Sequence, residues 1–178
     1  MPRHRSQPTP LDSAALERLA LRYVERYATT RGRLAAYLQR KIRERGWAAE
    51  VPADCQALAD KLAGLGYIDD RAFAETRAAA MARRGLGARR VNQALRFAGI
   101  ESEDAEAVAP AIAAESTASA LAFARRRRIG PFAREAPDRQ GRERQVAAMV
   151  RAGHAPALAW AIARMAPGED AETLLQSE

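Results

Sequence analysis

The sequence has little of what enzymes and secreted proteins usually depend on. Its 178 residues include one cysteine, Cys55, and two histidines, His4 and His154. A single cysteine excludes an internal disulfide and fits a reducing compartment, so we expect a cytoplasmic protein. The histidines lie far apart in the sequence without the spaced ligands of a metal site, and no nucleophile is paired with a general base. We therefore expect no metal, no cofactor and no enzymatic activity.

Aromatic residues and long apolar runs are also scarce. Aromatic side chains make up 6% of the chain, although 48% of its residues are hydrophobic. No apolar run approaches the ~20 residues of a membrane-spanning helix, so we expect no membrane association. No stretch alternates apolar and polar residues over the length of a strand, and alanine, leucine and arginine are strong helix formers. This composition predicts an all-α fold.

Positive charge is in excess. Lysine and arginine number 29 against 22 aspartate and glutamate residues, which gives a net charge of +7. Such a balance favours polyanionic partners, either nucleic acid or an acidic protein surface. The alternative is a basic surface that only keeps the protein soluble.

Glycines mark a repeat. Gly46, Gly99 and Gly153 are separated by 53 and 54 residues, and an apolar residue precedes each by four positions. Glycine just after a helix accepts the left-handed conformation that ends it, so we expect these three to be structural caps. The third copy has Gln145 where the pattern calls for an apolar residue. A fixed period of this size indicates stacked helical units.

These signals divide the chain into three-helix units. Capping residues, apolar spacing and proline or glycine breaks predict a disordered tail, three repeats and an acidic tail at residues 1–11, 12–66, 67–115, 116–166 and 167–178. Pro110 falls inside an expected helix of the second repeat, where we predict a kink or a split. Asp69 and Asp70 precede the first helix of that repeat. We interpret both as helix caps and not as paired catalytic carboxylates or metal ligands.

Three blocks in the second repeat resemble the RecX family of recombinase regulators. They are Leu65 to Ala74 with its Tyr-Ile-Asp-Asp cap, Arg83 to Val91 around a Gly-Leu-Gly turn, and Leu95 with Gly99-Ile100. The weaker first and third repeats fit the same family, so the resemblance spans roughly residues 13–165. The departures at Pro110 and Gln145 concern local packing.

The resemblance implies tandem three-helix repeats in an elongated, curved body. It also implies a regulatory protein, acting as a monomer, that binds the RecA filament on DNA. Such a protein would inhibit the recombinase, ATPase and co-protease activities of the filament, within DNA repair, recombination and the SOS response. The family brings no catalytic residue or cofactor. The alternative is a direct nucleic-acid-binding protein built of helix-turn-helix-like repeats, with single- or double-stranded DNA as its partner.

Arginine clusters are the candidate contacts with the RecA filament or DNA. One group brackets the Gly-Leu-Gly turn and should project from one edge of the second repeat: Arg83, Arg84, Arg89 and Arg90. The other is a run near the end of a helix: Arg125, Arg126, Arg127 and Arg128. Successive helical residues are ~100° apart, so these four cannot share one partner surface. Solvated surface charge remains the alternative for both groups.

Overall fold

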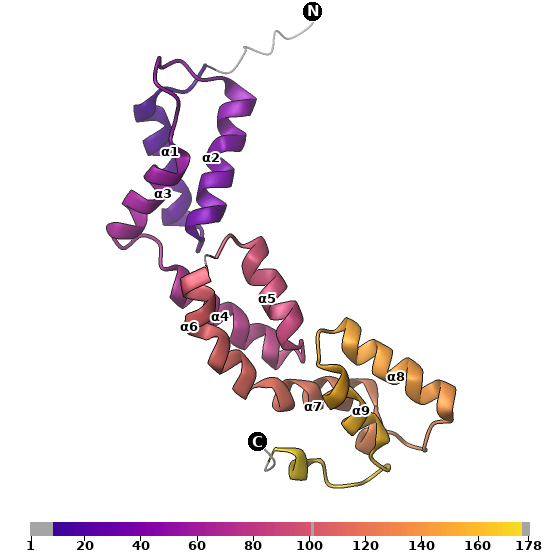
Figure 1. Cartoon of the computed structure of the whole chain (residues 1–178). Helices are drawn as coiled ribbons and strands as arrows, with labels where there is room; N and C mark the ends of the chain where they lie inside the picture. Colours follow the sequence, from indigo (N-terminus) through magenta and orange to yellow (C-terminus); the bar gives the residue numbers. More distant parts are fainter. Residues whose placement is uncertain (1–8, 101, 176–178) are drawn as a thin grey trace, which may run out of the picture. The chain divides into compact units, whose positions relative to one another are not determined.

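The computed structural model describes residues 9–100 and 102–175, and within them the protein is all-α (Figure 1). In these residues the only β-type pairing is an isolated bridge between Leu11 and Trp47. The nine α-helices that they form fall three by three into the predicted repeats: α1 (Ser13–Arg26), α2 (Arg31–Arg45), α3 (Cys55–Gly64); α4 (Asp70–Arg83), α5 (Ala88–Phe97), α6 (Ser102–Ala114); α7 (Ser116–Arg127), α8 (Arg139–Arg151), α9 (Pro156–Arg164). Two short 3-10 helices, η1 (Gly130–Phe132) and η2 (Ala171–Leu174), complete the list. The prediction of an all-α fold of tandem three-helix repeats is confirmed.

Packing groups these helices into two compact units. Of the described residues, unit 1 contains 9–73 together with Ala98–Ile100, and unit 2 contains Ala74–Phe97 and 102–175. Unit 1 therefore consists of the first repeat together with two short segments of the second repeat, residues 67–73 and Ala98–Ile100. Unit 2 consists of the rest of the second repeat and the whole described third repeat. The sequence pattern predicts the repeats but not this grouping.

The core of unit 1 is built from one apolar stripe on each of α1, α2 and α3. Leu16, Leu34, Leu38 and Leu62 are buried in it, and Cys55 is buried at the start of α3. Side-chain oxygens cap the N-termini of all three helices, from Asp12, Thr30 and Asp54. Local sequence signals are thus sufficient to place these helices.

The predicted disordered tail is wrong at its C-terminal end. Leu11 is fully buried in the core of unit 1. Its N–H donates to the carbonyl of Gly46 at 2.9 Å, and its own carbonyl accepts from the N–H of Ala48 at 2.9 Å. Ordered structure therefore begins before α1. Residues 1–8 of the predicted tail lie outside the described residues.

Unit 2 has its own core where α7, α8 and α9 meet. Ala124, Met149, Ala159 and Ile162 are fully buried there. Val146 is buried, while Gln145 is half-buried, and its Oε1 atom has no hydrogen-bond partner among the described residues. Part of the predicted acidic tail, η2, also packs against this core.

The helix is not split at Pro110, where we predicted a kink or a split. α6 continues through Pro110 to Ala114, and the proline is exposed on its surface. The chain bends by 59° at the break between Glu103–Ala114 and Ser116–Phe132. Taken together, these two segments have the length and apolar composition of a membrane span, and neither has them alone. No single described helix is long and apolar enough to cross a membrane.

Gly46, Gly99 and Gly153 have positive φ angles of 86°, 70° and 101°. Gly99 also packs against Gly32 of α2 within unit 1. A Cβ added at Gly32 would lie 2.7 Å from the Cα of Gly99. The hydroxyl of Thr30 donates to the carbonyl of Ala98 beside this contact. The glycine that ends a helix therefore also admits a second backbone at close range.

Candidate partner-binding surface

α4 ends at the turn Gly85–Leu86–Gly87, which leads into α5. Gly85 has a φ of 67°, in the region that glycine adopts without strain. The N–H of Gly85 donates to the carbonyl of Ala82 at 2.7 Å, and the N–H of Leu86 donates to that of Met81 at 3.0 Å. The turn therefore satisfies two of the carbonyls at the end of α4.

Both glycines of the turn are also sites of close packing. A Cβ at Gly85 would lie 2.8 Å from the backbone nitrogen of Phe123 and 2.6 Å from Nη2 of Arg126. A Cβ at Gly87 would overlap the backbone of Gly153. The missing side chains let α7 and the end of α8 lie directly against the turn, within unit 2.

The end of α8 supplies partners for the start of α5. The N–H of Gly87 donates to the carbonyl of Ala152 at 3.0 Å, and the N–H of Arg89 donates to that of Gly153 at 3.2 Å. The first N–H groups of a helix and the last carbonyls of another otherwise lack partners. Each helix end satisfies the other here, so the turn has a fixed base.

His154 packs against this junction and stabilises it. Its side chain is buried, its Nε2 lies 3.1 Å from the carbonyl oxygen of Gly85, and its ring centroid is 5.6 Å from that of Phe123. A carbonyl oxygen only accepts, so Nε2 carries the proton in the neutral ring. Burial lowers the pKa of His154 below its ordinary value of 6.5, and the hydrogen bond to Gly85 opposes that shift. Sequence reasoning missed this role because the partner is 69 residues away.

The four arginines that flank the turn are all exposed: Arg83, Arg84, Arg89 and Arg90. The side chains of the first three make no hydrogen bond or ion pair within the described chain. Arg90 is held in place, since its Nε donates to the carbonyl of Arg151 at 3.0 Å and its Nη1 to Oε1 of Gln93 at 3.2 Å. Three guanidinium groups around one turn are thus available to a partner, and the fourth has a fixed orientation.

The arginine run at the end of α7 is exposed along its length and spreads in several directions, as its helical position predicts. The guanidinium of Arg125 lies 4.9 Å from the ring centroid of Phe132, and that of Arg127 lies 5.9 Å from Phe123. Arg128 ends the helix with a φ of 55°. Arg126 reaches the turn, where its Nη2 lies against Gly85. The structure therefore joins one member of this run to the first group.

A hollow of about 290 Å³ opens beside the turn. Its lining residues come from α5 and the end of α8: Arg89, Arg90, Gln93, Val150, Arg151 and Gly153. Arg151 was not among the predicted contacts, although its place two residues before the Gly153 stop was a usable signal. We call six residues the turn cluster: Arg83, Arg84, Arg89, Arg90, Arg126 and Arg151.

The two aspartates predicted to cap α4 have different roles, which corrects the prediction. Asp69 is the cap, because its Oδ1 accepts from the N–H of Ala72 at 2.8 Å. Asp70 instead binds the start of α2, where its Oδ1 accepts from the backbone N–H of Arg31 and its Oδ2 from the Nε of Arg31. Its carboxylate is buried, so its role is structural. Among the described residues no group of three or more His, Cys, Asp or Glu side chains could hold a metal ion.

Comparison with known proteins gives two matches. Residues 69–108 match a family model described as "RecX, second three-helix domain". This segment includes α4, α5 and the turn between them. The chain is also 33% identical over 156 residues to the Regulatory protein RecX of Myxococcus xanthus (strain DK1622), which covers 83% of this chain and 83% of that protein.

Proposed function

Because this chain belongs to the RecX family of regulatory proteins, we propose that it binds the RecA filament on DNA and inhibits its recombinase, ATPase and co-protease activities. It would act as a cytoplasmic monomer and without chemistry of its own. Occupying the surface of the filament would limit its growth, and the loss of filament would lower all three activities together.

The turn cluster is the observation that carries this proposal. A filament wound on DNA offers phosphates and acidic side chains, and arginine binds both with a planar, bidentate fork. Four members of the turn cluster lie within residues 69–108, and the other two lie in α7 and α8. It thus combines residues from two repeats in one basic surface.

The glycine junction beneath the cluster supports the same role. Arg84 and Arg89 flank a turn whose backbone is fixed by glycine contacts, by α8 and by buried His154. A fixed base reduces the conformational entropy that is lost when side chains are ordered by a partner. Such a surface suits recognition better than a mobile loop with the same charges.

Charge reversal at the cluster tests the proposal. We expect Arg84→Glu/Arg89→Glu to raise the concentration needed for half-inhibition of RecA ATPase on single-stranded DNA by at least about tenfold, since exposed charges contribute much to association and little to folding. The matched control is Arg18→Glu/Arg22→Glu on α1, whose side chains are also exposed. An equal loss in both variants would mean that only the net charge matters.

The exposed face of α5 favours a second function, direct binding of nucleic acid. Arg89, Asn92 and Arg96 are exposed along this helix, and Phe97 is 80% exposed at its end. Arginines beside an exposed aromatic ring match the binding of single strands through phosphate contacts and base stacking. Tight, salt-dependent DNA binding without RecA, lost in Phe97→Ala, would favour this function over the first.

A further inference from the structure

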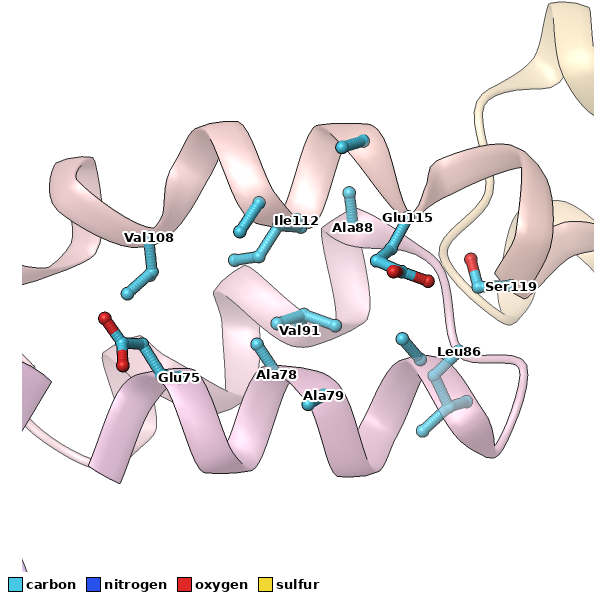
Figure 2. A pocket seen from close by; sticks show the side chains of 13 residues that line it. Glu75, Ala78, Ala79, Leu86, Ala88, Val91, Val108, Ile112, Glu115 and Ser119 are labelled. Atoms are coloured by element: carbon cyan, nitrogen blue, oxygen red, sulfur yellow. The ribbon is translucent and has the colours of Figure 1, made fainter. Parts of the chain in front are cut away.

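Two hollows of unit 2 have similar volumes and opposite linings. The first, of about 320 Å³, lies between α4 and α6 and is lined mainly by alanines, with Glu75 and Glu115 at its ends (Figure 2). The second, of about 290 Å³, is the hollow beside the Gly-Leu-Gly turn, and its lining includes three arginines: Arg89, Arg90 and Arg151. In the part of the chain that the structure describes, no acidic residue lines the second hollow. It therefore favours anions, which the first hollow disfavours.

The three arginines of this hollow lack nearby counter-ions. α5 contains no acidic residue. The glutamate of α8, Glu143, is paired with Arg139, at the opposite end of that helix from Arg151. Within the described chain, the side chains of Arg89 and Arg151 make no hydrogen bond or ion pair. Like charges gathered around one hollow repel one another, and a bound anion removes this repulsion.

Arg90 is already oriented for such an anion. Its Nε donates to the carbonyl of Arg151 at 3.0 Å and its Nη1 to Oε1 of Gln93 at 3.2 Å, which leaves Nη2 for a ligand. Its stem packs closely on Gly153, where an added Cβ would lie 2.8 Å from Cγ of Arg90. The carbonyl of Gly153 is also engaged, by the N–H of Arg89. The hollow thus presents donors, while these acceptors at its edge are already used.

This arrangement suits an anion with oxygens in several directions. A carboxylate has its two oxygens in one plane, and a single arginine fork binds both of them. The guanidinium groups here come from two helices, α5 and α8. A diphosphate has two tetrahedral groups that both carry negative charge, so several arginines can bind it at once. Among the described residues, no aromatic ring on which a base could stack lines the hollow.

We propose that this hollow binds a diphosphate group, either as free pyrophosphate or at the end of a nucleotide. Arg90 holds one phosphate group in a fixed position, and Arg89 and Arg151 pair with the other. Because all three arginines belong to the turn cluster, bound diphosphate competes with the RecA filament for this surface. That competition rests on the proposed function, whereas the site itself does not.

The direct test is calorimetric titration of the full chain, without RecA and without magnesium. The probes are pyrophosphate, orthophosphate and malonate, in which two carboxylates replace the two phosphate groups around one bridging atom. We expect saturable 1:1 binding of pyrophosphate, with a Kd at least about tenfold lower than for either other anion, because each offers fewer oxygens to the arginines. The absence of saturable pyrophosphate binding, or malonate binding of equal affinity, would overturn the proposal.

Adenosine diphosphate and adenosine distinguish the two sources of the diphosphate group. Adenosine diphosphate that binds as tightly as pyrophosphate would identify the end of a nucleotide as a ligand. Much weaker binding would restrict the ligand to free pyrophosphate. Adenosine, which lacks phosphate, should not bind. Adenosine binding as tight as that of its diphosphate would contradict recognition through phosphate.

Matched variants place the ligand in the hollow. Arg151→Gln should raise the Kd for pyrophosphate by at least about tenfold, since one charged partner is lost while the backbone carbonyl of residue 151 still holds Arg90. Arg144→Gln makes the same change of charge at an exposed position of α8 outside the lining and should leave the Kd unchanged. Equal losses in both variants would assign the binding to general surface charge and overturn the proposal. Circular dichroism of each variant confirms that it is folded.

The two proposals fail separately. A chain that binds pyrophosphate at this hollow but does not inhibit RecA would retain the site and refute the proposed function. A chain that inhibits RecA without binding pyrophosphate would do the reverse.

Discussion

Asp70 accepts two hydrogen bonds from Arg31, one from its backbone N–H at 3.0 Å and one from its Nε at 2.9 Å. The contact joins the start of α4 to the start of α2 across 39 residues of sequence. Asp69, its neighbour, makes only a local cap. Two adjacent aspartates therefore contribute differently to the stability of the fold.

This difference predicts different costs of substitution. Asp69→Ala should lower the free energy of unfolding by about 1 kcal/mol, as for a typical lost cap. Asp70→Ala should cost about 2–3 kcal/mol, because a charged hydrogen-bonding partner of Arg31 is removed. Urea denaturation measures both, provided that the m-value is unchanged.

Asparagine separates the two roles further. Asp69→Asn should be nearly neutral, since asparagine also caps helices well. Asp70→Asn should remain costly, because its amide group can replace only one of the two acceptor oxygens that Arg31 uses. Equal tolerance of asparagine at both positions would contradict the assigned contacts.

Gly32→Ala should destabilise unit 1. Its new Cβ would lie 2.7 Å from the Cα of Gly99, and overpacking of this kind costs about 1–3 kcal/mol. Gly64→Ala is the control, because Gly64 is also helical and has nothing within 4 Å of an added Cβ. The control should gain about 0.4–1 kcal/mol from the smaller entropy of the unfolded chain. Opposite signs in thermal or urea denaturation would confirm the close contact.

His154 predicts an acid-sensitive fold. Its pKa is lowered in the folded state by burial, so the unfolded chain binds a proton more readily. Stability should be intact above the ordinary pKa of 6.5 and should fall as the pH drops below it, until the lower folded pKa is reached. Urea midpoints at pH 7.5 and 5.5 measure the effect.

His154→Gln isolates this contribution, because glutamine can still donate to the carbonyl of Gly85 but does not titrate. The variant should lose less stability between the two pH values than the unaltered protein. The other histidine, His4, is present in both proteins and contributes equally. An identical pH dependence would show that His154 is not responsible.

Cys55 should report opening of unit 1. The thiol is buried, and its pKa is raised by that burial and, to a smaller extent, by the Asp54 carboxylate. Iodoacetamide reacts with the thiolate, so alkylation at neutral pH should be slow in the folded protein and fast in urea. Mass spectrometry follows the reaction. Fast alkylation without denaturant would mean that α3 opens readily.

Signals within a few residues were enough to predict the helices. Asp12 caps α1, and the four-residue spacing of Leu34 and Leu38 identifies the buried face of α2. Gly99 could be predicted to end a helix for the same reason, because the need for a positive φ angle after a helix is also local.

Contacts between distant residues could not be predicted in this way. The partner of Asp70 is 39 residues away, and that of His154 is 69 residues away. The candidate site shows the same limit. The sequence locates the arginines around the Gly-Leu-Gly turn, but only the packing of α7 and α8 adds Arg126 and Arg151 to them. A single sequence does not encode such pairings in its periodicity.

The burial of Leu11 decides where this protein can be shortened. A version that begins at Ser13 would retain every helix of the described chain and would look complete in a diagram of secondary structure. It would nevertheless lack a fully buried side chain and both hydrogen bonds that tie the entering chain to Gly46 and Ala48. Its lower stability would then be attributed to the helices, although the missing part is the segment that precedes them.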